Sequence, residues 1–318
     1  MTSTDHLARK LTARLKMRHL VLLRNIQLYG SLTRVADATG ISQPAVTKAL
    51  AEIEEIFEAP LFIRAGRGLQ PTALGQLAII KAQHMLQDID GWANEMNAVR
   101  DGRTARLCIG AMPYVSGELL TQAITHLYER HNIAIVIKQA TTDQLVQSLS
   151  DHEVDCVIGR SSAIAGMSGL WHEVLYTQYP MLIGNVKLAK RLEGRKQDLS
   201  ELATLKWILP APSTPVGTKV AEMFAQAQVR PPSPIIETYA VDVIHGMLSQ
   251  NDGIISIVPV DIALDLIRRG AIAAIPWEMN WELPPISLIR RVRTTPLDAE
   301  EKFAQILREA CSQLTRPR

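Results

Sequence analysis

Two short helical patterns on either side of a glycine, between Ser31 and Phe57, constrain the fold of this sequence most. Ser31 is placed to cap the first helix, and Gly40 is placed to end it, because glycine readily adopts the left-handed conformation that terminates helices. Ser42 can cap the second helix, with Pro44 in its first turn, where a missing amide proton costs little. The apolar residues that we expect on the buried face of the second helix are Val46, Leu50, Ile53 and Phe57. Such a pair of helices is the geometry that presents the second helix to the major groove of DNA.

A short strand and a turn rich in glycine and arginine follow the second helix. Residues 60–64 read Pro-Leu-Phe-Ile-Arg, and residues 65–69 read Ala-Gly-Arg-Gly-Leu. Because an apolar strand followed by a glycine turn favours a hairpin, this pattern predicts a β-wing beside the helices. We therefore expect a winged helix-turn-helix domain over residues 17–73.

The charge of the chain is concentrated at the same end. The 318 residues include 34 Lys and Arg and 32 Asp and Glu, so the formal net charge of +2 indicates no partner by itself. Residues 1–51, however, contain eight basic residues and two acidic ones. We expect this end of the chain to meet an anion, and residues 1–16 to form a basic N-terminal arm.

The start of the second helix and the wing supply candidate contacts to double-stranded promoter DNA. The Gln43 amide suits base edges, adenine best, whereas Thr47 and Lys48 lie one turn further and suit a phosphate or a neighbouring base. Arginines on the wing would reach the DNA backbone or the minor groove. Any one of these residues alone is as readily an ordinary solvated side chain; together, beside two helices and a local positive excess, they favour DNA binding. The candidate DNA contacts are Ser42, Gln43, Pro44, Thr47, Lys48, Arg64 and Arg67.

A proline-free segment of about 29 residues, from Thr72 to Arg100, predicts a long linker helix over residues 74–102. Five apolar residues in it are spaced by 4, 3, 4 and 3 positions, which is the seam of a coiled coil. These residues are Met85, Ile89, Trp92, Met96 and Val99. We expect this helix to pair with its copy in a homodimer; the alternative is that the seam packs on a neighbouring domain.

Beyond Gly102 the sequence alternates short apolar runs with helical patterns, which predicts an α/β domain with parallel sheets and crossover helices over residues 103–318. This length suits two half-domains with a ligand cleft between them. We expect lobe I at about 103–176 and 283–318, and lobe II at about 177–282. The expected strands are Leu107–Gly110, Ile133–Ile137, Val154–Gly159, Met181–Ile183, Trp207–Leu209, Pro234–Glu237, Ile254–Val258 and Ile286–Ile289.

Polar turns at the ends of these strands are candidates for binding a small-molecule effector. The turn after the first strand leads into a helix, whose N-terminus would favour an anion. Arg160 follows an apolar strand, where its charge needs an anionic partner or open water. Each serine or threonine in these turns could equally cap its own helix. The candidate effector contacts are Met112, Pro113, Tyr114, Ser116, Thr141, Thr142, Arg160, Ser161, Ser213, Thr214 and Thr238.

Residues 17–75 resemble the winged helix-turn-helix of LysR-type transcriptional regulators. The shared motifs are Val35-Ala36, the run from Ser42 to Thr47, Ile53-Glu54, the run from Pro60 to Arg64, and Thr72 to Gly75. Thr39 and Ile53 stand where the family usually has leucine, which concerns packing rather than the DNA face. Later segments resemble the family more weakly, at residues 154–159 and 251–259.

The resemblance implies a two-lobed, periplasmic-binding-protein-like effector domain. It also implies homodimers that pair through the linker helix and often form homotetramers that bend the promoter. Residues 109–113, 158–160 and 207–210 look most like the branch that includes regulators of sugar-binding-protein genes and of protocatechuate catabolism. That branch suggests a sugar, a dicarboxylic acid or an aromatic-acid metabolite as inducer. Nothing in this resemblance calls for a cofactor.

Other classes of protein fit the sequence less well. We find no nucleophile elbow, phosphate loop or zinc-protease motif, so an enzyme is not expected. The three cysteines are too widely spaced for a disulfide framework or a zinc site, and no metal site is expected. No segment reads as a signal peptide or a membrane span, so we expect a cytoplasmic protein without a membrane partner. Two alternatives stay open: a cytoplasmic small-molecule-binding protein, or a redox-sensing regulator that uses Cys108 and Cys156 on neighbouring strands, although buried inert thiols fit better.

Overall fold

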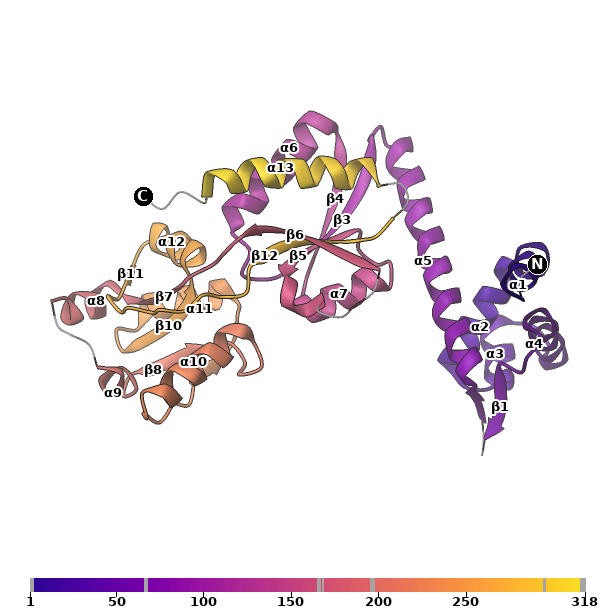
Figure 1. Ribbon diagram of the computed structural model, residues 1–318, viewed down its shortest axis with the longest axis horizontal. Helices are drawn as coiled ribbons and strands as arrows, with labels where there is room; N and C mark the ends of the chain where they lie inside the picture. The colour runs from indigo at the N-terminus through magenta and orange to yellow at the C-terminus, as the bar shows by residue number, and fades with distance from the viewer. Residues whose placement is uncertain are drawn as a thin grey trace. The chain divides into compact units, whose positions relative to one another are not determined.

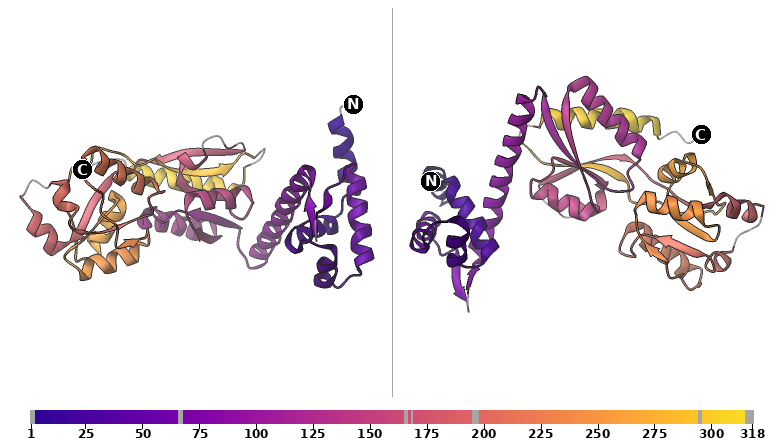
Figure 2. Two further views of the ribbon diagram at one scale, coloured as in Figure 1. Left: turned by 90° about the horizontal axis from the view of Figure 1, so that it is seen from below. Right: turned by 180° about the vertical axis from the view of Figure 1, so that it is seen from behind.

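The computed structural model describes residues 3–65, 68–164, 167, 169–194, 198–293 and 296–314, and the chain divides into two compact units. Unit 1 is Met1–Asn97 and unit 2 is Ala98–Arg318. Figure 1 labels most of the helices and strands of both units, and Figure 2 shows the chain from two further directions. Each unit is described by itself below.

Three helices form the centre of unit 1. They are α2 (Met17–Tyr29), α3 (Leu32–Thr39) and α4 (Gln43–Phe57). The Ser31 side chain caps α3 by accepting a hydrogen bond from the Arg34 amide, and Gly40 ends α3 in the left-handed conformation with φ of 70°. Both features agree with the predicted helix-turn-helix. The three helices enclose a cluster of buried leucine, isoleucine and valine side chains.

The start of α4 differs from the prediction in how Ser42 acts. Ser42 occupies the capping position, but its side chain makes no capping hydrogen bond. Pro44 has no amide proton to donate, and the Ala45 amide already donates to the Ser42 carbonyl at 2.9 Å. On the buried face of α4, Ile56 is fully buried whereas Phe57 is only partly covered.

The wing consists of β1 (Phe62–Ala65) and β2 (Gly68–Pro71), which pair as antiparallel strands. One Glu54 carboxylate oxygen accepts hydrogen bonds from the Leu61 and Phe62 amides, at 2.8 and 3.1 Å, and so fixes the start of the wing. At the far end, the Thr72 hydroxyl accepts from the Gly75 amide at 3.0 Å. A Cβ atom on Gly75 would lie 1.8 Å from the Leu61 carbonyl oxygen, so only glycine fits there.

Two further helices flank this domain in the chain. The residues predicted as a basic arm form helix α1 (Ser3–Arg14), which contacts α4. The expected linker helix is α5 (Ala73–Arg100), and it crosses the division between the units. Met85, Trp92, Met96 and Val99 of its apolar seam are exposed, with Trp92 at 67%, and Ile89 is partly covered.

Unit 2 contains two five-stranded sheets, each with its own buried cluster. The first sheet has the order β4-β3-β5-β12-β6. Helices α6 and α13 cover one face, and α7 with the short helix η1 covers the other, as Figure 1 shows. The elements of this sheet and its faces are β3 (Ala105–Ala111), α6 (Gly117–His131), β4 (Ile133–Gln139), α7 (Thr142–Ser150), β5 (Cys156–Arg160), η1 (Ser161–Ile164), β6 (Leu170–Tyr176), β12 (Ile286–Arg291) and α13 (Asp298–Leu314).

The second sheet has the order β11-β7-β10-β8-β9. Its core is centred on Trp207, whose ring meets that of Phe224 edge to face at 5.7 Å. The elements of this sheet and its faces are β7 (Pro180–Asn185), α8 (Val186–Leu192), α9 (Leu199–Leu202), β8 (Lys206–Leu209), α10 (Pro215–Gln226), β9 (Ile236–Glu237), α11 (Val241–Gln250), β10 (Ile254–Pro259), α12 (Val260–Arg268) and β11 (Ile272–Ala274). Among the described residues of both units, no helix is long and apolar enough to span a membrane.

The prediction of parallel sheets was wrong, because both sheets are mixed. β3 pairs in parallel with β4 and β5, but β12 runs antiparallel to β5 and β6. In the second sheet β7 is antiparallel to β10 and β11. Strands β6 and β11 were not expected: β6 is largely half-exposed with a mixed polar sequence, and β11 has three residues. An apolar run reveals a strand but not its direction, so the returning strands could not be told apart by pattern.

Candidate functional sites

The start of α4 offers an exposed polar surface in unit 1. Ser42, Gln43, Pro44, Thr47 and Lys48 are all exposed. The Gln43 amide nitrogen donates to the Thr47 hydroxyl at 3.2 Å, and that hydroxyl donates to the Gln43 carbonyl at 3.0 Å. These are weak surface hydrogen bonds that a base edge could replace.

Two basic side chains beside this surface have no acidic partner. Lys48 and Arg64 are exposed, and within the described part of the chain neither forms an ion pair. Arg67, the other predicted wing contact, lies outside the described residues. These two free cations therefore lie on α4, one turn beyond Gln43, and on β1, as an anion-binding surface requires.

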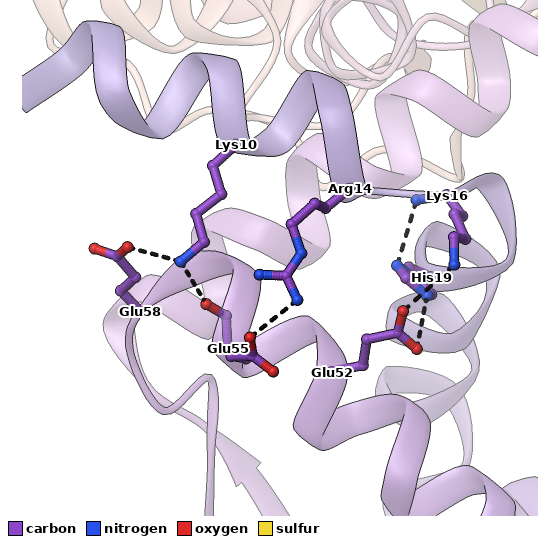
Figure 3. A network of polar contacts seen from close by, with 7 residues as sticks. All are labelled: Lys10, Arg14, Lys16, His19, Glu52, Glu55 and Glu58. Carbon is purple, nitrogen blue, oxygen red and sulfur yellow. Dashed lines mark hydrogen bonds and ion pairs between the residues drawn. The ribbon is translucent and has the colours of Figure 1, made fainter.

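Lys10 and Arg14 of α1, and Lys16 just after it, behave differently, because they pair with glutamates in α4 or at its C-terminal end. Figure 3 shows Lys10 paired with Glu58, Arg14 with Glu55, and Lys16 with Glu52. The positive excess of residues 1–51 ends just before these glutamates begin. The sequence indicates that the basic end of the chain meets an anion but leaves the role of the arm open; in the structure Lys10, Arg14 and Lys16 of the arm pair within unit 1.

Unit 2 contains a cleft of about 430 Å³ at the carboxyl ends of strands from both sheets. On the side of the first sheet it is lined by residues that follow β3 and β5 and by the start of α7. On the side of the second sheet it is lined by the turn after β8 and the start of α10. Its volume suits a small organic ligand.

Eight of the eleven predicted effector contacts lie in the lining of this cleft. They are Met112, Pro113, Tyr114, Thr141, Thr142, Arg160, Ser213 and Thr214. Thr141 and Thr214 also cap α7 and α10, as the alternative for such residues anticipated. Residues up to about a hundred positions apart in sequence thus line one cleft. This agrees with the rule that the carboxyl ends of parallel strands meet at one edge of a sheet.

The remaining three predicted residues are not brought into the lining. Ser116 is buried and caps α6, accepting from the Leu119 amide at 3.3 Å. Thr238 accepts from the Ala240 amide at 3.0 Å, and its neighbour Tyr239 lines the cleft instead. Ser161 begins η1, and its side chain lies outside the described residues.

Sequence reasoning missed six lining residues. Most of them are direct neighbours of predicted ones, so the turns were located but the inward-facing members were not all chosen. Tyr239 had a usable signal, since it follows the short β9 strand, which was expected. The missed residues are Asp143, Ser162, Pro210, Pro215, Val216 and Tyr239.

A glycine lets α7 approach the end of β5. A Cβ atom on Gly159 would lie 2.7 Å from the Thr142 methyl group and 3.1 Å from its hydroxyl oxygen. The same hydroxyl accepts from the Arg160 amide at 3.4 Å. This close contact places the N-terminus of α7 beside the arginine.

Arg160 is the last residue of β5 rather than a residue beyond the strand, and it is only 3% exposed. Its guanidinium donates to the Pro284 carbonyl, and to the Gln178 side-chain oxygen at 2.7 Å. These two partners lie in the two segments that connect the sheets, between β6 and β7 and between β11 and β12. Arg160 is therefore part of the connection between the lobes as well as of the cleft.

Gln178 extends this hydrogen-bond network to further residues. Its side-chain nitrogen donates to the Tyr114 carbonyl at 2.8 Å and to Asp261 at 2.9 and 3.0 Å. The Tyr176 hydroxyl also donates to Asp261, at 3.1 Å. The connecting segments are joined directly by a hydrogen bond from the Leu283 amide to the Gln178 carbonyl at 3.0 Å.

Burial sets the protonation behaviour of this network. It lowers the pKa of Arg160 to about 10, an effect that Asp261 and two tyrosines partly oppose. Burial also raises the pKa of Asp261, although hydrogen bonds from Gln178 and Tyr176 counteract it. At neutral pH the arginine stays charged, so the cleft contains a desolvated cation that only neutral oxygen atoms contact directly.

The redox alternative finds little support in the cysteine positions. In the β3–β5 register Cys156 lies opposite Ile109, so Cys156 and Cys108 point to opposite faces of the sheet. A bond between them would need a rearrangement of the sheet. Burial raises the pKa of both thiols, and Asp155 adds to the effect, which disfavours the reactive thiolate.

These two sites define a class of protein. Unit 1 is a winged helix-turn-helix with an exposed recognition helix, and unit 2 is a two-lobed α/β domain with a ligand-sized cleft at the strand ends. Comparison with known proteins supports this division. The model of the LysR substrate binding domain matches residues 100–312, and the model of bacterial regulatory helix-turn-helix proteins of the lysR family matches residues 17–76.

Among curated proteins, the chain is similar to the HTH-type transcriptional regulator PcaQ of Agrobacterium fabrum, with 28% identity over 95% of this chain and 96% of that protein. It is 27% identical to the HTH-type transcriptional regulator GbpR of Azospirillum brasilense, over 87% of this chain and 81% of that protein.

Solved structures share the fold. Full-length CbnR complexed with its target DNA has a TM-score of 0.61 at 18% identity, covering 93% of this chain and all of that one. ArgP from Mycobacterium tuberculosis has a TM-score of 0.63 at 13% identity, and the match covers 94% of this chain and 98% of that one.

The chain belongs to the LysR family of bacterial transcriptional regulators. It is a DNA-binding regulator of transcription with a domain for a small-molecule ligand, and the resemblance noted in the sequence is confirmed. The relatives are transcriptional regulators, which are not enzymes.

Proposed function

We propose that the start of α4 and the wing bind promoter DNA, and that the cleft of unit 2 binds a small anionic inducer that changes this binding. The chain acts in the cytoplasm as a homo-oligomer and catalyses no reaction. The observation that carries the DNA contact is the exposed Gln43 amide in the first turn of the recognition helix, with Lys48, exposed and without an ion pair in the described chain, one turn further. A side-chain amide there can read a base edge while the lysine neutralises a phosphate.

Replacing Gln43 with alanine is expected to weaken binding to a duplex selected from a random library by about tenfold, and to relax base preference at one position. The measurement is a titration at low salt, followed by a new selection with the variant. Gln122→Ala, an exposed glutamine on α6, is the matched control and should bind as the wild type does. If Gln43→Ala keeps both affinity and base preference, the proposed contact fails.

The exposed seam of α5 supports self-association. Four large apolar side chains on one side of a helix cost free energy when they face water, and in the described chain each is about half exposed or more. Their spacing is that of a two-stranded coiled coil. We propose that α5 of one chain pairs with α5 of a second chain.

Arg160 and two helix N-termini favour an anionic inducer, and Asp143 is the acidic residue in the same lining. Only two of the five guanidinium N–H groups of Arg160 have partners within the described chain, so three are available to a ligand. The N-termini of α7 and α10 line the same cleft, and helix N-termini attract negative charge. A carboxylate, including an aromatic acid, fits this arrangement best, and a sugar is the second candidate because hydroxyl-bearing side chains also line the cleft.

A screen of the full-length protein tests this proposal. We expect protocatechuate or succinate to raise the melting temperature more than its neutral amide or than glucose, because a ligand that binds only the folded state stabilises it. Ser213 lines the cleft, is exposed, and has no hydrogen-bond partner in the described chain. Ser213→Trp should therefore fill the cleft and remove the shift, whereas Ser312→Trp on α13 should not. An equal shift for acid and amide would rule out the anion site.

A further inference from the structure

Helix α1 is an addition to the family's DNA-binding domain. The family model begins at residue 17, whereas α1 covers Ser3–Arg14. Its apolar contacts are few: Leu11 and Leu15 are half-buried, and Leu7 stays 38% exposed. Polar contacts must therefore supply much of what holds α1 on α4.

These polar contacts form an antiparallel ladder. The Lys10 ammonium lies 2.7 Å from a Glu58 oxygen and donates to the Glu55 carbonyl at 3.0 Å. The Arg14 guanidinium donates to the Glu55 carboxylate at 2.9 Å. The charge and hydrogen bond of Lys10 lower the pKa of Glu58 below its ordinary value. Figure 3 shows the successive pairs along the two helices.

The ladder continues at the next turn of α4. The Lys16 ammonium lies 3.4 Å from one Glu52 oxygen, and the Arg18 guanidinium lies 3.9 Å from the other. Burial alone would raise the pKa of Glu52, but Lys16, His19 and Arg18 bring it below its ordinary value. The cations of the ladder thus extend toward the end of α4 that carries Gln43.

Glu52 and Glu55 project from the side of α4 that carries Lys48. At about 100° per residue, Glu55 projects within about 20° of Lys48. Glu52 projects within about 40° of Lys48 by the same geometry, and Glu58 is the left-handed residue that ends α4. Counted from Lys48, the glutamates lie about 6 to 15 Å further along the helix axis. This is comparable with the screening length of about 10 Å at 0.1 M salt, so uncompensated carboxylates there would repel DNA phosphates.

The segment that contains α1 also sets the net charge of unit 1. Residues 1–97 hold eleven Lys and Arg and nine Asp and Glu, a formal charge of +2. Without residues 1–15 there would be eight of each, and the formal charge would be zero. The cations of α1 are therefore the difference between a basic and a neutral DNA-binding unit.

We propose that α1, with Lys16 just after it, is a positioning element for DNA binding, in which Lys10, Arg14 and Lys16 cancel the carboxylates in and at the end of the recognition helix and hold α4 in place. α1 raises the affinity for duplex DNA through α4, without itself contacting bases. This inference rests on the proposed contact between α4 and DNA.

Two neighbouring residues of α1 allow a matched test in the full-length protein. Lys10 is paired with Glu58, whereas Arg9 is exposed and has no ion-pair partner in the described chain. Lys10→Glu and Arg9→Glu change the net charge equally on the same helix. In about 50 mM salt, we expect Lys10→Glu to weaken binding to the selected duplex about tenfold and Arg9→Glu no more than about threefold.

The salt dependence and a charge swap separate positioning from general destabilisation. The loss caused by Lys10→Glu should shrink to less than about twofold in about 300 mM salt, because the repulsion is screened. The double variant Lys10→Glu/Glu58→Lys should return to within about twofold of the wild type, since it restores both the pair and the net charge. Hydrogen exchange over residues 6–14 should increase in Lys10→Glu but not in Arg9→Glu.

Several results would overturn the proposal. Equal losses in Lys10→Glu and Arg9→Glu would show that only net charge matters. A loss that is the same in low and high salt, or that the swap does not rescue, would indicate a structural role alone. If Gln43→Ala also binds normally, the contact of α4 with DNA fails first. If Gln43→Ala weakens binding while the α1 variants behave alike, only the role of α1 fails.

Discussion

Replacing Arg160 with alanine is expected to lower the free energy of unfolding of unit 2 by about 2–4 kcal/mol, because it leaves buried oxygen acceptors without their donor. The Pro284 carbonyl and the Gln178 side chain would both lose the guanidinium. Intrinsic tryptophan fluorescence measures this unfolding selectively, since four of the five tryptophans belong to unit 2 and only Trp92 to unit 1.

Two variants complete the Arg160 experiment. Arg160→Lys keeps the charge but lacks the planar guanidinium with its several N–H donors. Its loss of unfolding free energy should therefore be smaller than that of Arg160→Ala but measurable. Arg191→Ala removes a surface arginine that pairs with Asp252 at 3.7 Å, and should cost less than about 1 kcal/mol. A loss for Arg160→Ala no larger than that for Arg191→Ala would contradict a structural role between the lobes. Because Arg160 serves both fold and cleft, its alanine variant cannot by itself identify the ligand contact.

Glu300 should make the stability of unit 2 depend on pH. It is 2% exposed on α13, and burial raises its pKa to about 7, although Arg293 at 3.5 Å and two further arginines oppose the shift. Because the folded-state pKa exceeds the ordinary value of 4.5, the folded state binds more protons between these values. The contribution of Glu300 to stability is therefore fully present below about pH 4.5 and is lost as pH rises toward about 7.

Glu300→Gln should abolish this loss. We expect the variant to match the wild type near pH 5 and to exceed its free energy of unfolding by at most about 3 kcal/mol at pH 8. Denaturant titrations followed by tryptophan fluorescence at several pH values would measure the difference. Glu309→Gln makes the same change at an exposed position of α13 and should show no such trend. A variant less stable than the wild type at pH 8 would show that the charged carboxylate stabilises the fold.

Local chemistry made much of the fold predictable. The ends of the helix-turn-helix depend on Ser31 and Gly40, each of which acts on its own neighbours. The lining of the cleft was also largely predictable, because the carboxyl ends of parallel strands meet at one edge whatever their separation in sequence. Arg160 was chosen for its charge at a strand end, and it does line the cleft.

What could not be predicted depends on partners distant in sequence. The Pro284 carbonyl that accepts from Arg160 lies 124 residues away, and no pattern marks a backbone oxygen as a partner for a cation. The charge count indicated a strongly positive end of the chain because it ended at residue 51, one residue before Glu52, and it left the role of the arm open. Only the docking of α1 shows that acidic residues of α4 satisfy those charges.

Because Gly75 at the start of α5 packs closely against the Leu61 carbonyl, we expect the wing and the linker helix to move together. With Glu54 holding the first residues of the wing and Gly75 pressed against the Leu61 carbonyl, α5 cannot tilt without carrying β1 and β2 with it. A rotation of α5 by a few degrees would be magnified along its 28 residues into a displacement of its far end. We expect the stiffness of this joint to determine how closely β1 and β2 follow any motion of α5.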